Sequence, residues 1–288
     1  VMFFGWEKVS KRTHLVTTWL TGIGAAISAL WILIANSWMQ HPVGMEFNPD
    51  TVRHEMVDFW ALVLNPVAIS KFFHSVFSGW MTGAIFAIGI SCWYLLKKRE
   101  TRFALASIRV SAIVGIVGTF AVMLSGDSSG IHVAKYQPMK LAAAEGLMDG
   151  GERAPFSIVP GVEVPGMLSI LATHDINGYV PGINNLLDGY TTPEGVVVPS
   201  AEERIERGKT AIEAFGDYRT LRESDPVAAA EARKVLDENI DYFGYGYIDS
   251  PEELVPSVGL VYWAFRVMVG LGCALLLLMM VVLWAEFK

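Results

Sequence analysis

The chain has 288 residues, of which 52% are hydrophobic and only 18% are charged. This composition is typical of an integral membrane protein, because a water-soluble domain of this length carries more charge on its surface. The formal net charge is −7, yet residues 127–256 hold 22 acidic and 10 basic residues, and an acidic segment between net-basic stretches argues against nucleic acid as a partner.

Four apolar segments are each long enough to cross a hydrocarbon core of roughly 30 Å. They cover, approximately, residues 14–39, 66–96, 103–124 and 257–284. Pro66 suits the first turn of the second segment. The sequence therefore predicts an all-α membrane helix bundle with four complete spans.

Two polar connections separate these spans. Residues 40–65 are broken by prolines, and we expect a short amphipathic helix at the membrane surface over 50–64. Residues 127–256 are too many and too polar for a plain loop. This insertion opens with a turn-like GDSSG cluster, and its expected helices cover 137–148, 199–215 and 225–243, with irregular structure over 150–198 and Ser200 as a helix cap.

Basic residues fix the expected orientation of the spans. Lys8, Lys11 and Arg12 precede the first span, and the basic loop of residues 97–102 follows the second, so both belong on the cytoplasmic side. The insertion then lies outside, in the periplasm of a Gram-negative cell. We expect three parts: membrane helices in 1–126, an outer insertion in 127–256 and a last membrane helix in 257–288. Val1 is not a start methionine, and we expect a fragment of a longer protein.

His74 is the most unusual residue of the second span. At helical spacing it shares a face with Ser70, Ser78 and Thr82, and an imidazole within lipid is costly unless it has a partner. Two interpretations stay open from this segment alone: a hydrogen bond to a neighbouring helix, or a metal or haem ligand. Cys92 and Cys273 stand singly in apolar runs, so neither a zinc site nor covalent c-type haem attachment is indicated.

Met268 and Arg266 stand in the fourth span. His74 lies roughly 12 Å along its helix and Met268 roughly 16 Å along its own, counted from the outer ends, so the two can reach the same level. A His/Met pair is a ligand set for low-spin haem, although methionine in a span is more often packing. Arg266 needs an anion, either a haem propionate or a carboxylate, and it projects from a different side of the helix than Met268.

Lys140 and Glu145 lie on the expected helix at 137–148. A cation and a carboxylate near the membrane surface can bind a quinol head group and accept its protons. The alternative is an ordinary solvated helix face.

Several long motifs resemble subunit I of the cytochrome bd-type quinol oxidases. They are GWEKVSKRTHLVTTWL, SALWILIANSWMQHP, NPVAISKFFHSVFSGWMTGAIFAIGISCWYLLKKRE, GDSSG followed by QPMKLAAAE, and YWAFRVM. They occur in the order of the family and extend from Gly5 to the last span, with residues 150–256 the poorest part.

The resemblance implies a respiratory enzyme that oxidises ubiquinol or menaquinol and reduces oxygen to water. His74 and Met268 match the axial ligands of its low-spin haem b, and Arg266 matches the arginine before the methionine ligand. The insertion matches the quinol loop, with Lys140 and Glu145 at the positions of quinol oxidation. Ser28 matches a serine on the proton route to the oxygen-reducing site.

Parts of the family pattern are missing from this chain. The N-terminal helices with the histidine of haem d and the C-terminal part with the ligand of the high-spin haem b are not found, so we expect the quinol-oxidising part only. The resemblance also implies a second subunit, small accessory subunits and a bacterial inner membrane. A transporter or channel whose path is lined by His74 and Arg266, and a structural membrane anchor, are the alternatives from composition alone.

Overall fold

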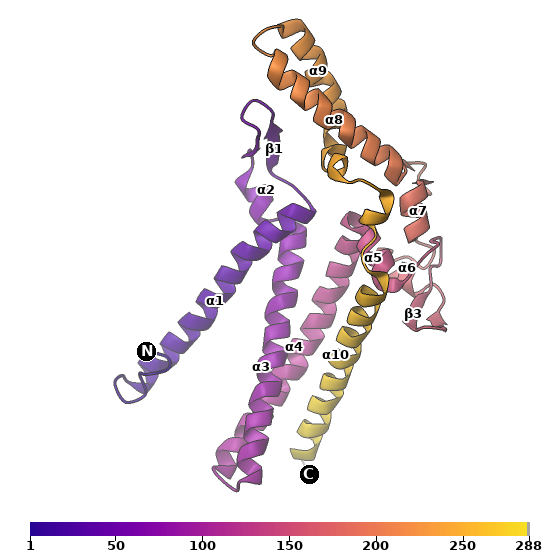
Figure 1. Ribbon diagram of the computed structural model, residues 1–288. Coiled ribbons are helices and arrows are strands. Elements are labelled where there is room, and N and C mark those ends of the chain that lie inside the picture. The colour runs from indigo at the N-terminus through magenta and orange to yellow at the C-terminus, as the bar shows by residue number, and fades with distance from the viewer. Residues whose placement is uncertain (287–288) are drawn as a thin grey trace. The chain divides into compact units, whose positions relative to one another are not determined.

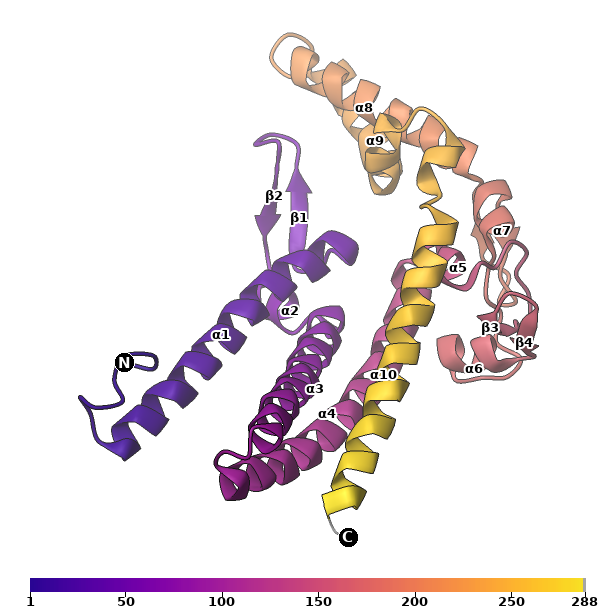
Figure 2. The same cartoon turned by 60° about the horizontal axis from the view of Figure 1, so that its bottom comes forward.

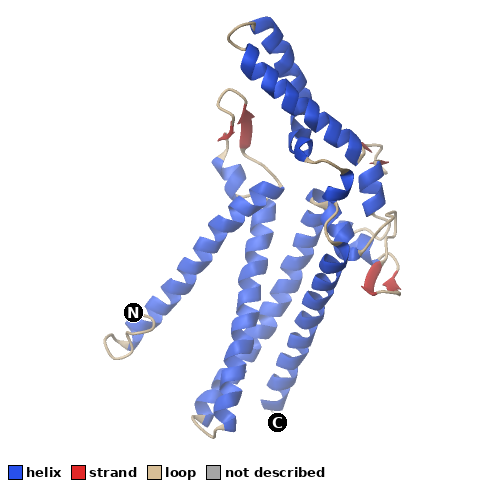
Figure 3. Cartoon of the chain, in the orientation of Figure 1, coloured by secondary structure: helices blue, strands red, loops and turns tan. Residues whose placement is uncertain are grey.

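The computed structural model describes residues 1–286. Within that range, four helical segments are long and apolar enough to cross a membrane: Lys11–Gln40, Phe59–Leu96, Thr101–Tyr136 and Pro251–Glu286. Helices dominate, and the strands form short two-stranded pieces (Figure 3). The predicted all-α membrane bundle with four spans is therefore confirmed.

The chain divides into two compact units, which we describe separately. Among the described residues, the first comprises 1–46, 56–129 and 272–286, and the second comprises 47–55 and 130–271. Helices of the first unit are α1 (Lys11–Gln40), α2 (Phe59–Val63), α3 (Pro66–Leu96), most of α4 (Thr101–Tyr136) and the C-terminal part of α10 (Val258–Glu286).

Small residues let α3, α4 and α10 approach closely within the first unit. Ile88, Ala112 and Met279 form one buried cluster. A Cβ placed on Gly115 would lie 2.2 Å from the sulfur of Met279 and 2.9 Å from the Cβ of Ala84. Only glycine fits at this contact, as is usual where membrane helices cross closely.

The connection before α3 differs from the prediction. In place of an amphipathic helix over 50–64, strands β1 (Met45–Asn48) and β2 (Arg53–Met56) form a hairpin, and only α2 is helical. Asn65 then starts α3: its side chain accepts a hydrogen bond from the Val67 amide and donates one to the His41 carbonyl at 3.1 Å. This fully buried cap fixes where the helix begins.

The expected turn at GDSSG is wrong. α4 continues through Gly126–Gly130 and ends at Tyr136, so the insertion begins as an extension of a membrane helix. Glycine and serine have poor helix propensity, and the tight packing around Gly126 described below explains why they are tolerated here.

The second unit holds the insertion and the start of α10. Its helices are α5 (Pro138–Glu145), α6 (Met167–Thr173), α7 (Ile183–Asp188), α8 (Ala201–Leu221), α9 (Pro226–Asn239) and the 3-10 segments η1 (Ile240–Tyr247) and η2 (Pro251–Leu254). Its strands form antiparallel pairs, β3 (Phe156–Val159) with β4 (Val162–Val164) and β5 (Tyr190–Thr191) with β6 (Val197–Val198) (Figures 1 and 2). The region expected to be irregular thus contains short hairpins and helices.

Helices α8 and α9 pack on each other around Ala211, Ala214 and Leu236. The predicted cap is confirmed, because the Ser200 hydroxyl accepts from the Glu203 amide at 3.2 Å. Phe47 in the β1–β2 hairpin contacts the rings of Phe215 and Phe243. This contact between distant segments explains why residues 47–55 belong to the second unit.

Candidate functional site

The imidazole of His74 is held from one side only. Its Nδ1 lies 3.3 Å from the Ser125 hydroxyl on α4, and that hydroxyl donates to the Ala121 carbonyl at 2.7 Å. A hydroxyl has one hydrogen, so Ser125 accepts from Nδ1–H of His74. With Nδ1–H as the donor, Nε2 is the ring nitrogen whose lone pair can bind a metal.

The polar stripe around His74 does not bind the ring. The hydroxyls of Ser70, Ser78 and Thr82 donate to carbonyls of their own helix, at Val67, His74 and Ser78 respectively. Among residues 1–286, Nε2 of His74 has no hydrogen-bond partner. Of the two interpretations left open by the sequence, a hydrogen-bond partner on the neighbouring helix is therefore present at Nδ1, and the ligand role stays a prediction for Nε2.

Gly126 makes room for this ring. A Cβ at this position would lie 3.3 Å from Cε1 and 3.5 Å from Nδ1 of His74, which is tighter than most side-chain contacts. The glycine of the GDSSG motif thus lets α4 pass directly beside the imidazole. These observations fit a haem ligand, whose ring needs a fixed orientation and one open nitrogen.

Met268 lies on α10 with 54% of its surface exposed. It belongs to the second unit and His74 to the first, so their pairing stays a prediction. No cluster of three or more His, Cys, Asp or Glu that could hold a metal ion occurs in residues 1–286. A two-ligand His/Met site does not require such a cluster.

Arg266 forms a buried ion pair with Glu145. Its Nη2 donates to Oε2 of Glu145 at 2.7 Å, and the two side chains are only 8% and 3% exposed. The sequence predicts that Arg266 needs an anion and leaves the haem propionate and the carboxylate open. Within the second unit that anion is a carboxylate.

Further groups enclose the guanidinium of Arg266. Nε donates to the Ser157 carbonyl at 3.0 Å, Nη1 donates to the Ala144 carbonyl, and the ring of Tyr262 lies 4.0 Å away. The carbonyl groups satisfy donors that the carboxylate does not reach, and the aromatic face adds a cation–π contact. A buried charge is stable only when its hydrogen-bonding groups have partners in this way.

The end of α5 positions Glu145 for this pair. Helix α5 stops at Gly146, which has a φ of +65°, a conformation that favours glycine. A Cβ there would lie 3.2 Å from the ring of Tyr262. Glu145, the last helical residue, is therefore enclosed by α10 on the side where Arg266 lies.

Burial raises the pKa of the Glu145 carboxyl above its ordinary value, and the hydrogen bond and charge of Arg266 oppose that rise without cancelling it. A carboxylate with a raised pKa is a better proton acceptor.

Lys140 is exposed in the first turn of α5. Gln137 precedes this helix, and its side-chain oxygen is buried without a hydrogen-bond partner among the described residues. A buried acceptor without a donor calls for a missing partner, so Gln137 joins Lys140 and Glu145 as a candidate site residue. Sequence reasoning missed it, although it opens the QPMK motif.

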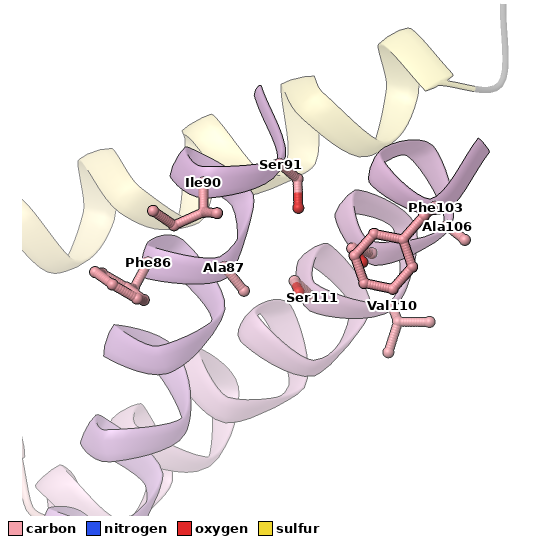
Figure 4. Close-up of a pocket in the computed structure, with 9 residues that line it drawn as sticks. Phe86, Ala87, Ile90, Ser91, Phe103, Ala106, Val110 and Ser111 are labelled. Carbon is pink, nitrogen blue, oxygen red and sulfur yellow. The ribbon is translucent and has the colours of Figure 1, made fainter. Parts of the chain in front are cut away.

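Two features of the first unit involve none of these residues. Ser28 is exposed on α1, and nothing in its surroundings tests the proton route. A pocket of 530 Å³ between α3 and α4 is lined mainly by small and apolar side chains, including Ala87, Ser91 and Phe103 (Figure 4). It contains none of the candidate site residues.

Comparison with known sequences decides the family. The sequence model described as cytochrome bd terminal oxidase subunit I matches residues 1–288. The chain belongs to this family. The cytochrome bd-II ubiquinol oxidase subunit 1 of Escherichia coli (strain K12) is 38% identical over 298 residues, which cover 98% of this chain and 58% of that protein.

A second relative agrees with this assignment. The cytochrome bd ubiquinol oxidase subunit 1 of Bacillus subtilis (strain 168) is 33% identical over 293 residues, covering 98% of this chain and 50% of that protein. The chain thus spans 58% and 50% of the length of these two relatives. With its four candidate spans, it is a bacterial membrane protein.

The fold has a solved counterpart. The structure of the bd oxidase from Geobacillus thermodenitrificans matches with a TM-score of 0.56 and 21% sequence identity, over 99% of this chain and 72% of that one. This likeness concerns the fold alone.

Proposed function

We propose that this bd family chain is the quinol-oxidising part of a terminal respiratory oxidase, and that it passes electrons to a low-spin haem b held by His74 and Met268. The observation that carries this proposal is the imidazole of His74, fixed at Nδ1 by Ser125 and open at Nε2 within a candidate span.

The two proposed ligands have different tasks. His74 offers Nε2 in a fixed orientation, because Ser125 and Gly126 leave its ring little freedom. Met268 supplies a thioether, which raises the reduction potential relative to a second histidine. When bound, the haem takes up and releases one electron at a time. Arg266 is engaged by Glu145 and Ser157, so we propose that it acts beside the haem rather than as a direct contact of the iron.

Quinol oxidation is assigned to Gln137, Lys140 and Glu145. A quinol loses two electrons and two protons, and each hydroxyl needs an acceptor. The free oxygen of Gln137 can accept one quinol hydroxyl group in a hydrogen bond, and Glu145 can take a proton because burial raises its pKa. Lys140 can orient the oxygen of the head group with its ammonium.

The same proposal covers location and partners. We place residues 127–256 on the outer side of the membrane as a quinol loop, on the grounds of the basic residues flanking the first and third spans. Haem d, the high-spin haem b and oxygen reduction are assigned to parts of the longer relatives that this chain does not match. A second subunit, with or without small accessory subunits, completes the oxidase, and either ubiquinol or menaquinol is its substrate.

The first test is a haem spectrum of the assembled oxidase. His74→Ala and Met268→Leu should each abolish the low-spin haem b band, while His54→Ala in the β1–β2 hairpin and Met280→Leu on the same helix as Met268 should leave it intact. If both ligand variants keep the band, the assignment fails. A transporter, channel or plain anchor predicts no haem band in the unchanged protein.

The second test separates the quinol site from the haem. Lys140→Ala, Glu145→Ala and Gln137→Ala should lower quinol oxidation and largely spare oxidation of an artificial electron donor. Lys135→Ala is the matched control for Lys140→Ala, because Lys135 is also a lysine at an exposed position nearby. Equal losses with both donors contradict the quinol-site role.

A further inference from the structure

The β3–β4 hairpin of the second unit has an unusual composition. Phe156 pairs with Val164 and Val159 with Val162, and the turn between the strands is Pro160–Gly161, with a φ of +85° at the glycine. Proline followed by glycine with positive φ suits a tight turn. The hairpin is therefore a well-defined element with its own tip.

Aliphatic side chains cover this hairpin on its outside. The exposed fractions are 48% for Ile158, 41% for Val159, 52% for Val162 and 40% for Val164. Glu163 is the only charged residue between 156 and 164. A hairpin that faces water on one side normally alternates apolar and polar residues, and a contiguous apolar patch marks a surface that something apolar covers.

The base of the hairpin is attached to the side of α10. The Ser157 hydroxyl lies 2.8 Å from the Tyr262 hydroxyl, and Nε of Arg266 donates to the Ser157 carbonyl at 3.0 Å. The Phe156 ring lies 5.4 Å from the guanidinium of Arg266. These contacts fix the hairpin to one helix face at a defined height.

That height lies within the candidate span of α10. Tyr262 and Arg266 are four and eight residues beyond Val258, hence roughly 6 and 12 Å along the helix from its start. The candidate span itself begins at Pro251. Figures 1 and 2 both show β3 beside the first turns of α10 and not beyond its end.

We propose that the β3–β4 hairpin dips into the bilayer, with its aliphatic tip in contact with lipid. Contact with lipid requires only apolar side chains at the level of the membrane. Apolar side chains at the level of the first turns of α10 are provided by Ile158, Val159, Val162 and Val164. The core of a protein interface is typically enriched in aromatic residues, methionine and arginine, and none of these occurs at 157–165.

Backbone chemistry limits how deep the tip reaches. A two-stranded hairpin has unpaired N–H and C=O groups along both edges, and open edges do not occur in the hydrocarbon core. The tip therefore lies in the interfacial layer, where water and head groups satisfy the edges while apolar side chains reach the upper acyl chains. Glu163 can remain among the head groups.

The hairpin's lipid contact rests on α10 crossing a bilayer and does not depend on quinol oxidation. Its test is an environment-sensitive fluorophore at Val162→Cys in the assembled oxidase, reconstituted in phosphatidylcholine vesicles, with Cys92 and Cys273 replaced by serine. Val159→Cys serves as a second position. Val197→Cys is the matched control, because Val197 is also an exposed valine in a hairpin, at 73%, in the same unit.

The label at 162 should show blue-shifted emission, loss of intensity with lipids that carry a nitroxide near the head group, and protection from iodide. The label at 197 should show the reverse. Quenching by iodide at 162 and 159 overturns the proposal, because it means water contact. Protection from both quenchers also overturns it, because it means that protein covers the tip. Neither outcome affects the haem and quinol tests.

Discussion

The buried pair of Arg266 and Glu145 should carry a large share of the stability of its unit. Arg266→Leu removes the cation and leaves a carboxylate that is 3% exposed without a partner, together with the Ser157 and Ala144 carbonyls. Breaking a buried pair from one side costs about 3–5 kcal/mol. For a chain of this size, that lowers the apparent unfolding temperature by on the order of 10 °C.

A second ion pair in the same unit provides the control. Arg207 and Glu203 are 2.6 Å apart, close to the 2.7 Å of the buried pair, but their side chains are 44% and 46% exposed. Exposed pairs contribute about 0–1 kcal/mol, so Arg207→Leu should hardly change the unfolding temperature. The N–O distances of the two pairs are thus matched, whereas burial and the additional contacts of Arg266 differ.

The assay is thermal unfolding of the purified full chain in detergent, followed by tryptophan fluorescence. The double variant Glu145→Leu/Arg266→Leu should recover much of the loss, because two apolar side chains replace a buried pair at little cost. If Arg266→Leu is as mild as Arg207→Leu, or if the double variant is no better than the single one, the reasoning from burial is refuted.

Three further predictions use the same unfolding assay. Glu145→Gln should flatten the dependence of the unfolding temperature on pH. Because the pKa of Glu145 is raised in the folded state, its contribution to stability is fully present below the ordinary pKa of glutamate and is lost as the pH rises through the raised pKa. An unchanged dependence on pH would contradict this. Gly115→Leu should cost about 1–3 kcal/mol by overpacking, and Met279→Ala should relieve it; no relief would mean that the contact is not the cause. Asn65→Ala should cost about 1–2 kcal/mol through the lost helix cap. Asn65→Ser, a neutral capping residue, should recover part of this loss without the hydrogen bond to His41, and equal losses with Ala and Ser would contradict the capping role.

The membrane helices could be predicted from the sequence because their signals are local. A long apolar run is enough to indicate a span, and Pro66 marks the start of α3 within the run itself. Ser200 likewise caps α8 through an amide three residues away. None of these features depends on a distant part of the chain.

Other elements could not be predicted because distant contacts decide them. The turn signal of GDSSG is overridden by the approach of Gly126 to His74, which lies on another helix. The β1–β2 hairpin places Phe47 against Phe215, far along the chain, and no pattern in residues 40–65 shows that partner. The sequence-based expectation of a helix there used only local amphipathicity.

The individual residues of the site could be predicted from the sequence, but the ion pair between Arg266 and Glu145 could not. The rule that an arginine in a span needs an anion correctly singled out Arg266. Glu145 was singled out separately as a carboxylate on another helix, 121 positions away. Spacing gives no means to join residues so far apart, and two candidate anions therefore remained until the fold was known.

The ion pair between Arg266 and Glu145 also affects the direction in which Met268 projects. The side chain of Arg266 is fixed by Glu145, by the Ser157 carbonyl and by the Tyr262 ring, and these contacts set the rotation of α10 about its own axis. Two residues further along a helix is a turn of about 200°, so Met268 projects nearly opposite to Arg266. The ion pair therefore directs the proposed haem ligand away from Glu145 without touching it. It follows that Arg266→Leu, but not Arg207→Leu, should shift the low-spin haem b band or its reduction potential, whereas an unshifted band in a folded variant would mean that other contacts hold α10 in register.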